Sequence, residues 1–301
     1  MCIRDRNVPA TVYQYNLKTE KRKKLKQQKI PAGFNKNKYE TKRVFAKSHD
    51  GKKIPISILK LKTTKNNAPT LLYGYGSYGM SMAPSFSVAR LSLVDRGMVF
   101  AIAHIRGGME KGRQWYLDGK LRKKKNTFKD FIKSAKFLKN SKISGDLTIH
   151  GGSAGGLLIG STINMAPKLF KSAVADVPFV DVLNTILDAS LPLTPPEWEE
   201  WGNPILNKND FLSIQSYSPY DNVRKQEYPS LLVTAGLTDP RVTYWEAAKW
   251  VARLRELKTD NNDIFLKTNM DAGHAGKAGR YHQIDETAFM YSFILNSHNL
   301  L

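Results

Sequence analysis

The sequence has 301 residues, 41% apolar and 10% aromatic, a composition that supports a substantial core and excludes a globally disordered chain. Its single cysteine, Cys2, excludes an internal disulfide and a cysteine-based zinc site, and so low a cysteine content is typical of a reducing, cytoplasmic location. The longest apolar runs are too short to cross a bilayer, so we expect no membrane partner.

The net charge of +21 is concentrated near the N-terminus. Residues 1–65 hold 19 Lys and Arg against 4 Asp and Glu, a net charge of +15, which leaves +6 for residues 66–301. The basic run Lys21–Lys26 is typical of a solvated surface, and it lacks the interleaved aromatic residues of an RNA-binding sheet. We therefore expect no nucleic-acid partner, and we keep a basic RNA- or ribosome-binding segment as an alternative.

The predicted elements change in character along the chain. Residues 11–62 favour short strands separated by polar turns, with alternating polarity in Thr11–Leu17 and again in Ile54–Leu61. From Pro69 onward short apolar strands alternate with amphipathic helices, which predicts an α/β fold with a mainly parallel sheet covered on both faces. The strands expected there are 70–75, 98–104, 147–150, 173–177, 231–235 and 264–268, and the helices 85–96, 127–140, 155–165, 179–189, 242–258 and 282–297.

The strongest local motif is Gly-Gly-Ser-Ala-Gly-Gly at residues 151–156. It contains Gly-x-Ser-x-Gly directly after an apolar strand and directly before an apolar helix, the context in which a strained turn exposes a nucleophilic serine. A phosphate-binding loop would need a Lys-Ser or Lys-Thr pair, which is missing here. The motif therefore predicts Ser153 as a nucleophile, with the backbone N–H of Ala154 as one oxyanion donor.

A nucleophilic serine needs a base and an orienting acid, which follow it in the order Ser, Asp, His in this architecture. Three histidines follow Ser153, and His274 is the one in a loop of small residues directly after the last predicted strand. Asp239 lies just beyond the strand at 231–235, where open α/β sheets place their active groups. We therefore predict His274 as base and Asp239 as acid, with Asp271 as the competing acid.

Several motifs in combination resemble the oligopeptidase B branch of the prolyl oligopeptidase family of serine peptidases, from about residue 11 to the end. These motifs are Tyr-Gly-Tyr-Gly-Ser-Tyr-Gly (73–79), Ile-Arg-Gly-Gly (105–108) with Glu110, Lys-Lys-Lys-Asn-Thr-Phe (123–128), the serine motif, Val-Pro-Phe-Val-Asp-Val (177–182), Ser-Tyr-Ser-Pro (216–219), Tyr-Trp-Glu (244–246) and Gly-His (273–274).

The resemblance implies an α/β-hydrolase fold with Ser153, Asp239 and His274 as the catalytic triad. It assigns the second oxyanion donor to Tyr75 and implies no cofactor and no metal. It also implies cleavage of short peptides after Arg or Lys, with Arg241 holding the substrate backbone. A carboxylester hydrolase with the same triad is the alternative activity.

Glu197 and Glu199 match the acidic substrate-binding residues of the family. Clustered carboxylates suit a cationic side chain, and they bind an arginine bidentately, which supports a basic residue at P1. A solvated helix start, where the helix dipole favours acids, is the alternative explanation of these two residues. The family's acids linked to a second basic residue are absent from Ser81–Ser85, where Ala83 and Ser85 stand in their place.

The resemblance also covers only the catalytic domain and the last strands of the family's N-terminal β-propeller. We therefore expect residues 1–62 to be residual propeller strands with a lead-in, and residues 63–301 to be the peptidase domain. The rest of the propeller is expected as an intramolecular partner encoded before this sequence, because the strands near the N-terminus have no evident partners.

Overall fold

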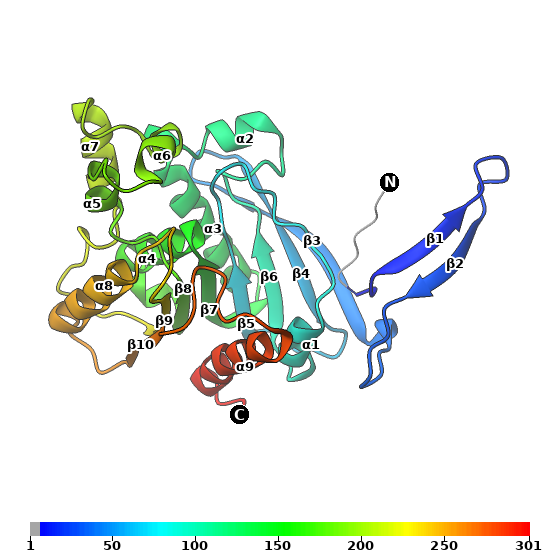
Figure 1. Cartoon of the computed structure of the whole chain (residues 1–301). Helices are drawn as coiled ribbons and strands as arrows, with labels where there is room; N and C mark the ends of the chain where they lie inside the picture. The colour runs from blue at the N-terminus through cyan, green and yellow to red at the C-terminus, as the bar shows by residue number, and fades with distance from the viewer. Residues whose placement is uncertain (1–6) are drawn as a thin grey trace.

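The computed structural model describes residues 7–301, so Cys2 lies outside the described residues. An eight-stranded sheet forms its centre (Figure 1), in the order β10-β9-β8-β7-β5-β6-β4-β3. Neighbours from β10 to β6 run parallel, and β4 and β3 add two antiparallel strands at one edge. The strands of this sheet are β3 (Tyr39–Lys47), β4 (Lys53–Leu61), β5 (Ala68–Tyr73), β6 (Val99–Ala103), β7 (Ser144–Gly152), β8 (Ser172–Asp176), β9 (Ser230–Gly236) and β10 (Ile264–Asn269).

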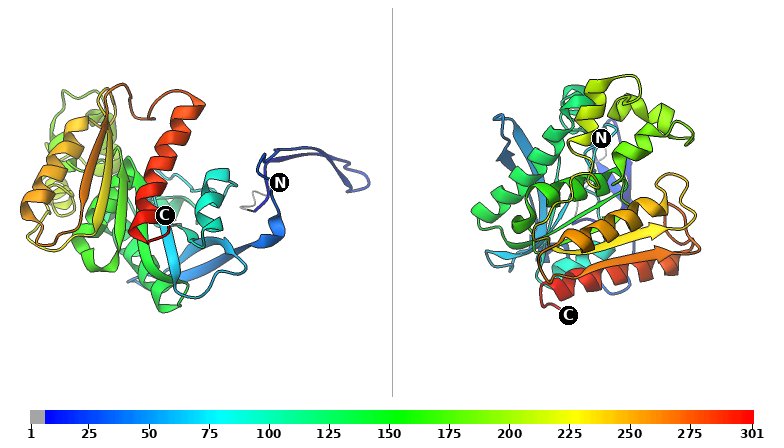
Figure 2. Two further views of the ribbon diagram at one scale, coloured as in Figure 1. Left: turned by 90° about the horizontal axis from the view of Figure 1, so that it is seen from below. Right: turned by 90° about the vertical axis from the view of Figure 1, so that its left-hand side faces the viewer.

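Helices cover both faces of the sheet, because its central strands are apolar on both sides. Neighbouring residues Leu71 and Leu72 on β5 are both buried, yet they belong to two separate core clusters on opposite faces. One cluster includes α3 (Lys125–Asn140), α4 (Ala154–Met165) and α8 (Tyr244–Leu257); the other includes α1 (Val88–Asp95) and α9 (Arg280–Ser297). Figure 2 shows α9 lying along the face opposite α8.

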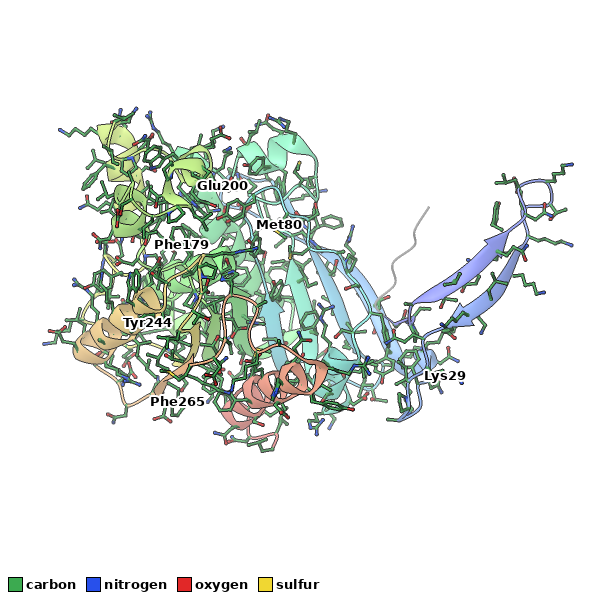
Figure 3. The ribbon with its side chains drawn as sticks, viewed as in Figure 1. Lys29, Met80, Phe179, Glu200, Tyr244 and Phe265 are labelled. Carbon is green, nitrogen blue, oxygen red and sulfur yellow. The ribbon has the colours of Figure 1, made fainter. Side chains whose placement is uncertain are left out.

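Three further helices gather at the end of the sheet toward which β5 and β6 point (Figure 1). They are α5 (Val182–Leu187), α6 (Thr194–Trp201) and α7 (Lys208–Gln215), and the short helix α2 (Arg113–Leu117) lies at the same end. Met80, Phe179 and Glu200 also lie at this end of the molecule (Figure 3). The carboxyl ends of the parallel strands are where an α/β sheet places its ligands, so this end is the one to search for a site.

The hairpin of β1 (Thr11–Tyr15) and β2 (Arg22–Gln27) forms its own two-stranded sheet and projects away from the rest of the molecule (Figures 1 and 2). Its apolar side chains are exposed, including Tyr15 at 53% and Leu17 at 87%. Strands β3 and β4, by contrast, are hydrogen-bonded into the main sheet. The expected boundary after residue 62 therefore lies beyond two strands that pair with the main sheet.

All six strands and six helices expected after Pro69 are present, with ends shifted by a few residues. The helix expected at 179–189 is shorter, because residues 179–181 lie in the loop before α5 and the helix ends at Leu187. The pattern did not predict β3, whose nine residues include four charged ones at the exposed edge of the sheet. It also missed α2, α6 and α7, which are only five to eight residues long.

Candidate active site

The chain turns sharply between β7 and α4, and Ser153 lies at that turn. Ser153 has a φ of 55°, in the left-handed region that non-glycine residues rarely adopt. Its backbone N–H donates to the Asp176 carbonyl on β8 at 2.8 Å, which fixes the turn against the sheet. A Cβ atom at Gly151 would collide with the Gly155 carbonyl oxygen, so the turn requires a glycine there. The strand, turn and helix that the serine motif needs are therefore all present.

Asp239 lies three residues beyond β9, and its side chain is fully buried. One carboxylate oxygen accepts the backbone N–H groups of Arg241 at 2.8 Å and Val242 at 3.0 Å, and the other lies 2.7 Å from His274 Nδ1. Burial alone would raise the pKa of Asp239, but the hydrogen bonds from His274, Val242 and Arg241 together lower the pKa below its ordinary value. Asp239 is therefore ionised at neutral pH and orients the His274 ring.

His274 comes from the loop after β10, and this loop packs directly on the one that carries Asp239. The Thr238 N–H donates to the Ala272 carbonyl at 3.3 Å. A Cβ atom at Gly236 would lie 2.5 Å from the same carbonyl oxygen, so glycine is needed for the approach of the two loops. Among the described residues, Ser153 and His274 share no hydrogen bond. Contacts of this kind are often long without substrate and shorten in the substrate complex.

Tyr75 and Ala154 both line the same cavity as Ser153. Ala154 is the first residue of α4, where backbone N–H groups have no partner within the helix. Burial, with smaller contributions from Tyr73 and Glu197, raises the pKa of Tyr75 to about 12. The Tyr75 hydroxyl therefore keeps its proton at neutral pH and is available as a hydrogen-bond donor.

Lys124 fixes the loop that carries Tyr75, a role that the sequence did not indicate. Its buried ammonium donates to the Gly76 carbonyl and to Ser77 Oγ, both at 2.7 Å, and lies 4.8 Å from the centre of the Trp201 ring. Burial lowers the pKa of Lys124 to about 8, against a smaller opposing effect of the Glu200 charge. Lysines in a basic stretch are almost always solvated, so no sequence pattern marks this one.

The cavity beside Ser153 has a volume of about 440 Å³. Glu197 of α6 and Arg241 of the loop after β9 line it together with Ser153, Ala154 and Tyr75. Arg241 forms no ion pair with any of residues 7–301. Much of the remaining wall is apolar and consists of Phe179, Ile186, Leu191, Pro192, Leu193, Pro240 and Val242. An apolar wall with a few polar groups suits an extended side chain with a polar end.

Only one of the two predicted glutamates reaches this cavity. Glu197 lines it, whereas Glu199 is exposed and lies outside the lining. The second inward carboxylate of α6 is Glu200, which accepts the Tyr78 N–H at 3.0 Å and the Tyr116 hydroxyl at 2.5 Å beneath the cavity wall. Residues three apart share a helix face and residues two apart do not, so the helical spacing from Glu197 could have indicated Glu200.

Glu246 is a buried glutamate that lines the cavity together with Glu197. The sequence did not indicate it as a site residue. It accepts the backbone N–H groups of Val180 at 3.0 Å and Asp181 at 2.9 Å, and the Thr185 hydroxyl at 2.7 Å. Burial raises the pKa of Glu246 to about 7, even though these hydrogen bonds oppose the shift. Glu246 therefore ties the segment before α5 to α8 and fixes one side of the cavity.

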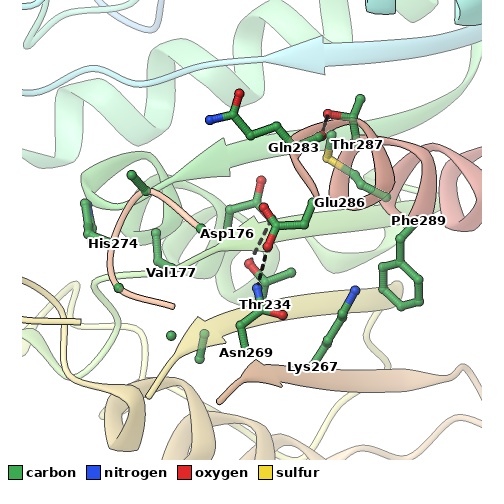
Figure 4. Close-up of a pocket in the computed structure, with 16 residues that line it drawn as sticks. Asp176, Val177, Thr234, Lys267, Asn269, His274, Gln283, Glu286, Thr287 and Phe289 are labelled. Atoms are coloured by element: carbon green, nitrogen blue, oxygen red, sulfur yellow. Dashed lines mark hydrogen bonds between the residues drawn. The ribbon is translucent and has the colours of Figure 1, made fainter. Parts of the chain in front are cut away.

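A second cavity, of about 410 Å³, lies beside His274 between the ends of β8 to β10 and α9 (Figure 4). Asp176 accepts the Thr234 hydroxyl there at 3.0 Å, and its other oxygen lies 2.6 Å from His150 Nε2. Glu286 of α9 accepts the Asn269 amide at 2.8 Å (Figure 4). His274 lines this second cavity and not the one with Ser153, which holds the other predicted site residues except Asp239 and the exposed Glu199.

Within residues 7–301 there is no group of three or more His, Cys, Asp or Glu side chains placed to hold a metal ion. Across the same residues, no helix is both long and apolar enough to cross a membrane.

Comparisons with known proteins show which proteins this chain is similar to. A family model described as the prolyl oligopeptidase family matches residues 84–300. Dipeptidyl aminopeptidase BI of Pseudoxanthomonas mexicana is 50% identical over 293 residues, which cover 96% of this chain and 40% of that protein. Protease 2 of Moraxella lacunata is 47% identical over 292 residues, covering 96% of this chain and 42% of that protein.

Solved structures match equally well. Oligopeptidase B from Leishmania major superposes with a TM-score of 0.94 at 48% identity, over 99% of this chain and 42% of that one. Oligopeptidase B from Trypanosoma brucei, solved in a closed form with covalently bound antipain, gives a TM-score of 0.94 at 46% identity, over 98% of this chain and 42% of that one. The chain therefore spans about two fifths of the length of these relatives.

Proposed function

Because the chain belongs to the prolyl oligopeptidase family, we propose that it is the catalytic part of a serine endopeptidase that cleaves short peptides after Arg or Lys. Its mainly parallel eight-stranded sheet, covered by helices on both faces, is the α/β-hydrolase fold of that family. The observation that carries the proposal is the single cavity that holds Ser153, both oxyanion donors and the Glu197 carboxylate.

The proposed reaction begins with attack of Ser153 Oγ on the carbonyl carbon of the scissile peptide bond. His274 Nδ1 faces Asp239, so Nε2 is the nitrogen left to take the serine proton as the substrate closes the gap between them. The Ala154 N–H and the Tyr75 hydroxyl donate hydrogen bonds that stabilise the negative charge developing on the carbonyl oxygen. The amine leaves with the proton from His274, and water then hydrolyses the acyl-enzyme with His274 as base.

Charge in the cavity supports a basic side chain at P1. Glu197 supplies a carboxylate inside an apolar wall, where an ion pair with Arg or Lys is stronger than it would be in water. Glu199 lies outside the wall, so we assign substrate binding to Glu197 rather than to both glutamates. Arg241, without an acidic partner among residues 7–301, is free to donate to a substrate backbone carbonyl.

We also propose that the β1–β2 hairpin belongs to a preceding β-propeller, which would be the intramolecular partner of the hydrolase unit. Two features support this: within residues 7–301 the two strands of the hairpin pair only with each other, and the hairpin exposes apolar side chains such as Tyr15 and Leu17. On this proposal the hydrolase unit begins near residue 39 rather than 63, because β3 and β4 belong to the main sheet. Location in the cytoplasm stays a prediction.

The experiment that tests the proposed function compares three fluorogenic substrates: an arginyl amide, an amide with a neutral P1 residue and a short acyl ester. We expect the arginyl amide to be cleaved with the highest kcat/KM, and Ser153→Ala to abolish cleavage of all three. Ser153-dependent hydrolysis of the ester without cleavage of either amide would contradict the proposal and indicate a carboxylester hydrolase.

A further inference from the structure

Tyr78 has a strained backbone in the wall of the cavity beside Ser153. Its φ of 57° lies in the left-handed region, which bulky residues rarely adopt unless the surroundings impose it. The surroundings do so here: the Tyr78 N–H donates to buried Glu200 at 3.0 Å, and the preceding Ser77 is held by Lys124. Strain that the surroundings maintain in a site points to a role for the residue it positions.

The Tyr78 side chain contacts Glu197, the carboxylate that we propose binds the P1 side chain of the substrate. Its hydroxyl donates to Glu197 Oε2 at 2.9 Å, and Trp201 Nε1–H donates to the same oxygen at 2.6 Å. The Tyr78 and Trp201 rings meet edge to face, with centres 5.6 Å apart. Burial and the neighbouring Glu197 charge raise the pKa of Tyr78, so its hydroxyl keeps the proton that it donates.

The two hydrogen bonds leave one carboxylate oxygen available to a ligand. Glu197 and Glu246 are the acidic residues that line the cavity, and both Glu246 oxygens accept hydrogen bonds from the protein. Among residues 7–301, none donates a hydrogen bond to Glu197 Oε1. Glu197 Oε1 is thus the carboxylate oxygen in this cavity that a cationic side chain can reach without displacing a protein donor.

We propose that Tyr78 is a positioning residue for substrate specificity, whose hydroxyl holds Glu197 so that Oε1 is presented to the cationic end of an Arg or Lys side chain. The inference rests on the proposed function and deepens it. Without the hydroxyl, Glu197 keeps its charge but its side chain rotates more freely in the unbound chain. Binding a cation then has to order the Glu197 side chain, and this entropy cost weakens the binding. A neutral P1 side chain makes no such ion pair and loses nothing.

The test is Tyr78→Phe, with Tyr116→Phe as a matched control. Both changes delete one phenol hydroxyl that is bonded to a glutamate of α6, but Tyr116 donates to Glu200 instead of Glu197. The measured quantity is the ratio of kcat/KM for an arginyl amide to that for a neutral-P1 amide. We expect Tyr78→Phe to lower this ratio on the order of tenfold, mainly through a higher KM for the arginyl amide. Tyr116→Phe should leave the ratio within about twofold.

A double-mutant cycle with Glu197→Gln sharpens the test, because Tyr78→Phe should not lower the ratio further once the carboxylate is gone. Equal losses on both substrates, or the same fall in the ratio for Tyr116→Phe, would overturn the inference and leave Tyr78 as a structural residue. An unchanged ratio in Tyr78→Phe, with a wild-type chain that prefers arginine, would overturn this inference alone. A wild-type chain without Ser153-dependent cleavage of either amide would overturn the proposed function as well.

Discussion

The Asp239 carboxylate and the His274 imidazole are joined by a 2.7 Å hydrogen bond, although the two residues are 35 positions apart in the chain. They meet because β9 and β10 are parallel neighbours that end side by side, and each residue lies in the loop after its strand. The carboxylate is buried and accepts two further backbone N–H groups, so it has one fixed orientation.

Asp239→Asn should lower kcat about 10³- to 10⁴-fold with little change in KM, because an amide can present its NH2 group to the ring and favour the wrong tautomer. Asp271→Asn is the matched control, since Asp271 is in the His274 loop but its side chain is 85% exposed and 4.0 Å from Lys277. Steady-state kinetics on an arginyl amide measure both variants. Equal losses in the two would mean that Asp239 is not the orienting acid.

Tyr75→Phe should lower kcat about 10²- to 10³-fold, as expected for loss of one oxyanion donor, and should leave KM nearly unchanged. Tyr73→Phe is the control, because Tyr73 lies two residues earlier at the end of β5 and does not line the cavity. The activity that depends on Tyr75 should persist well above neutral pH, since the Tyr75 pKa is raised to about 12. Full activity in Tyr75→Phe would remove this hydroxyl from the mechanism.

Gly151→Ala should destabilise the fold by about 1–3 kcal/mol and abolish activity, because its Cβ meets the backbone of Gly155, which cannot move without breaking the turn. Gly152→Ala should be tolerated, since a Cβ there would lie 3.4 Å from the Asp176 carbonyl oxygen, in ordinary contact. Urea unfolding and amide hydrolysis measure the pair. If Gly152→Ala proved as damaging as Gly151→Ala, the steric account of the turn would be wrong.

Glu246 should make stability depend on pH. Its pKa of about 7 in the folded chain lies above the ordinary value of 4.5, so the folded state binds the proton more tightly than the unfolded state does. Stability from this group is therefore fully present below pH 4.5 and is lost as pH rises to about 7. The shift corresponds to about 3 kcal/mol at most.

Urea unfolding at pH 5 and pH 8 tests this prediction. Glu246→Gln should reduce the difference in unfolding free energy between the two pH values, whereas Glu256→Gln, on the exposed side of the same helix, should not change it. A difference that is the same in wild type and Glu246→Gln would show that Glu246 does not titrate in this range.

Much of the site could be predicted because each part has a local signature. The glycines around Ser153 mark a turn that bulkier residues cannot form, and Asp239 and His274 directly follow strands with clear apolar patterns. Parallel strands bring such loops to one edge, so sequence order and strand prediction were enough to group Asp239 with His274.

The parts that were missed depend on tertiary contacts. Lys124 looks like any lysine of a basic stretch until the loop at Gly76 and Ser77 closes over it. Helical spacing from Glu197 favours Glu200 over Glu199, but the contacts of Glu200 with Tyr78 and Tyr116 form only in the folded chain. Strand β3 is an edge strand whose exposed charges hide its alternation.

The central claim is that Ser153 is a nucleophile activated by His274, and covalent labelling with a fluorophosphonate tests it most directly. We predict that the chain gains one phosphonyl group, found by mass spectrometry on the peptide that contains Ser153. His274→Ala should slow the labelling at least about a hundredfold, and Ser153→Ala should abolish it. Labelling at another residue, or at the same rate in Ser153→Ala, would contradict the account.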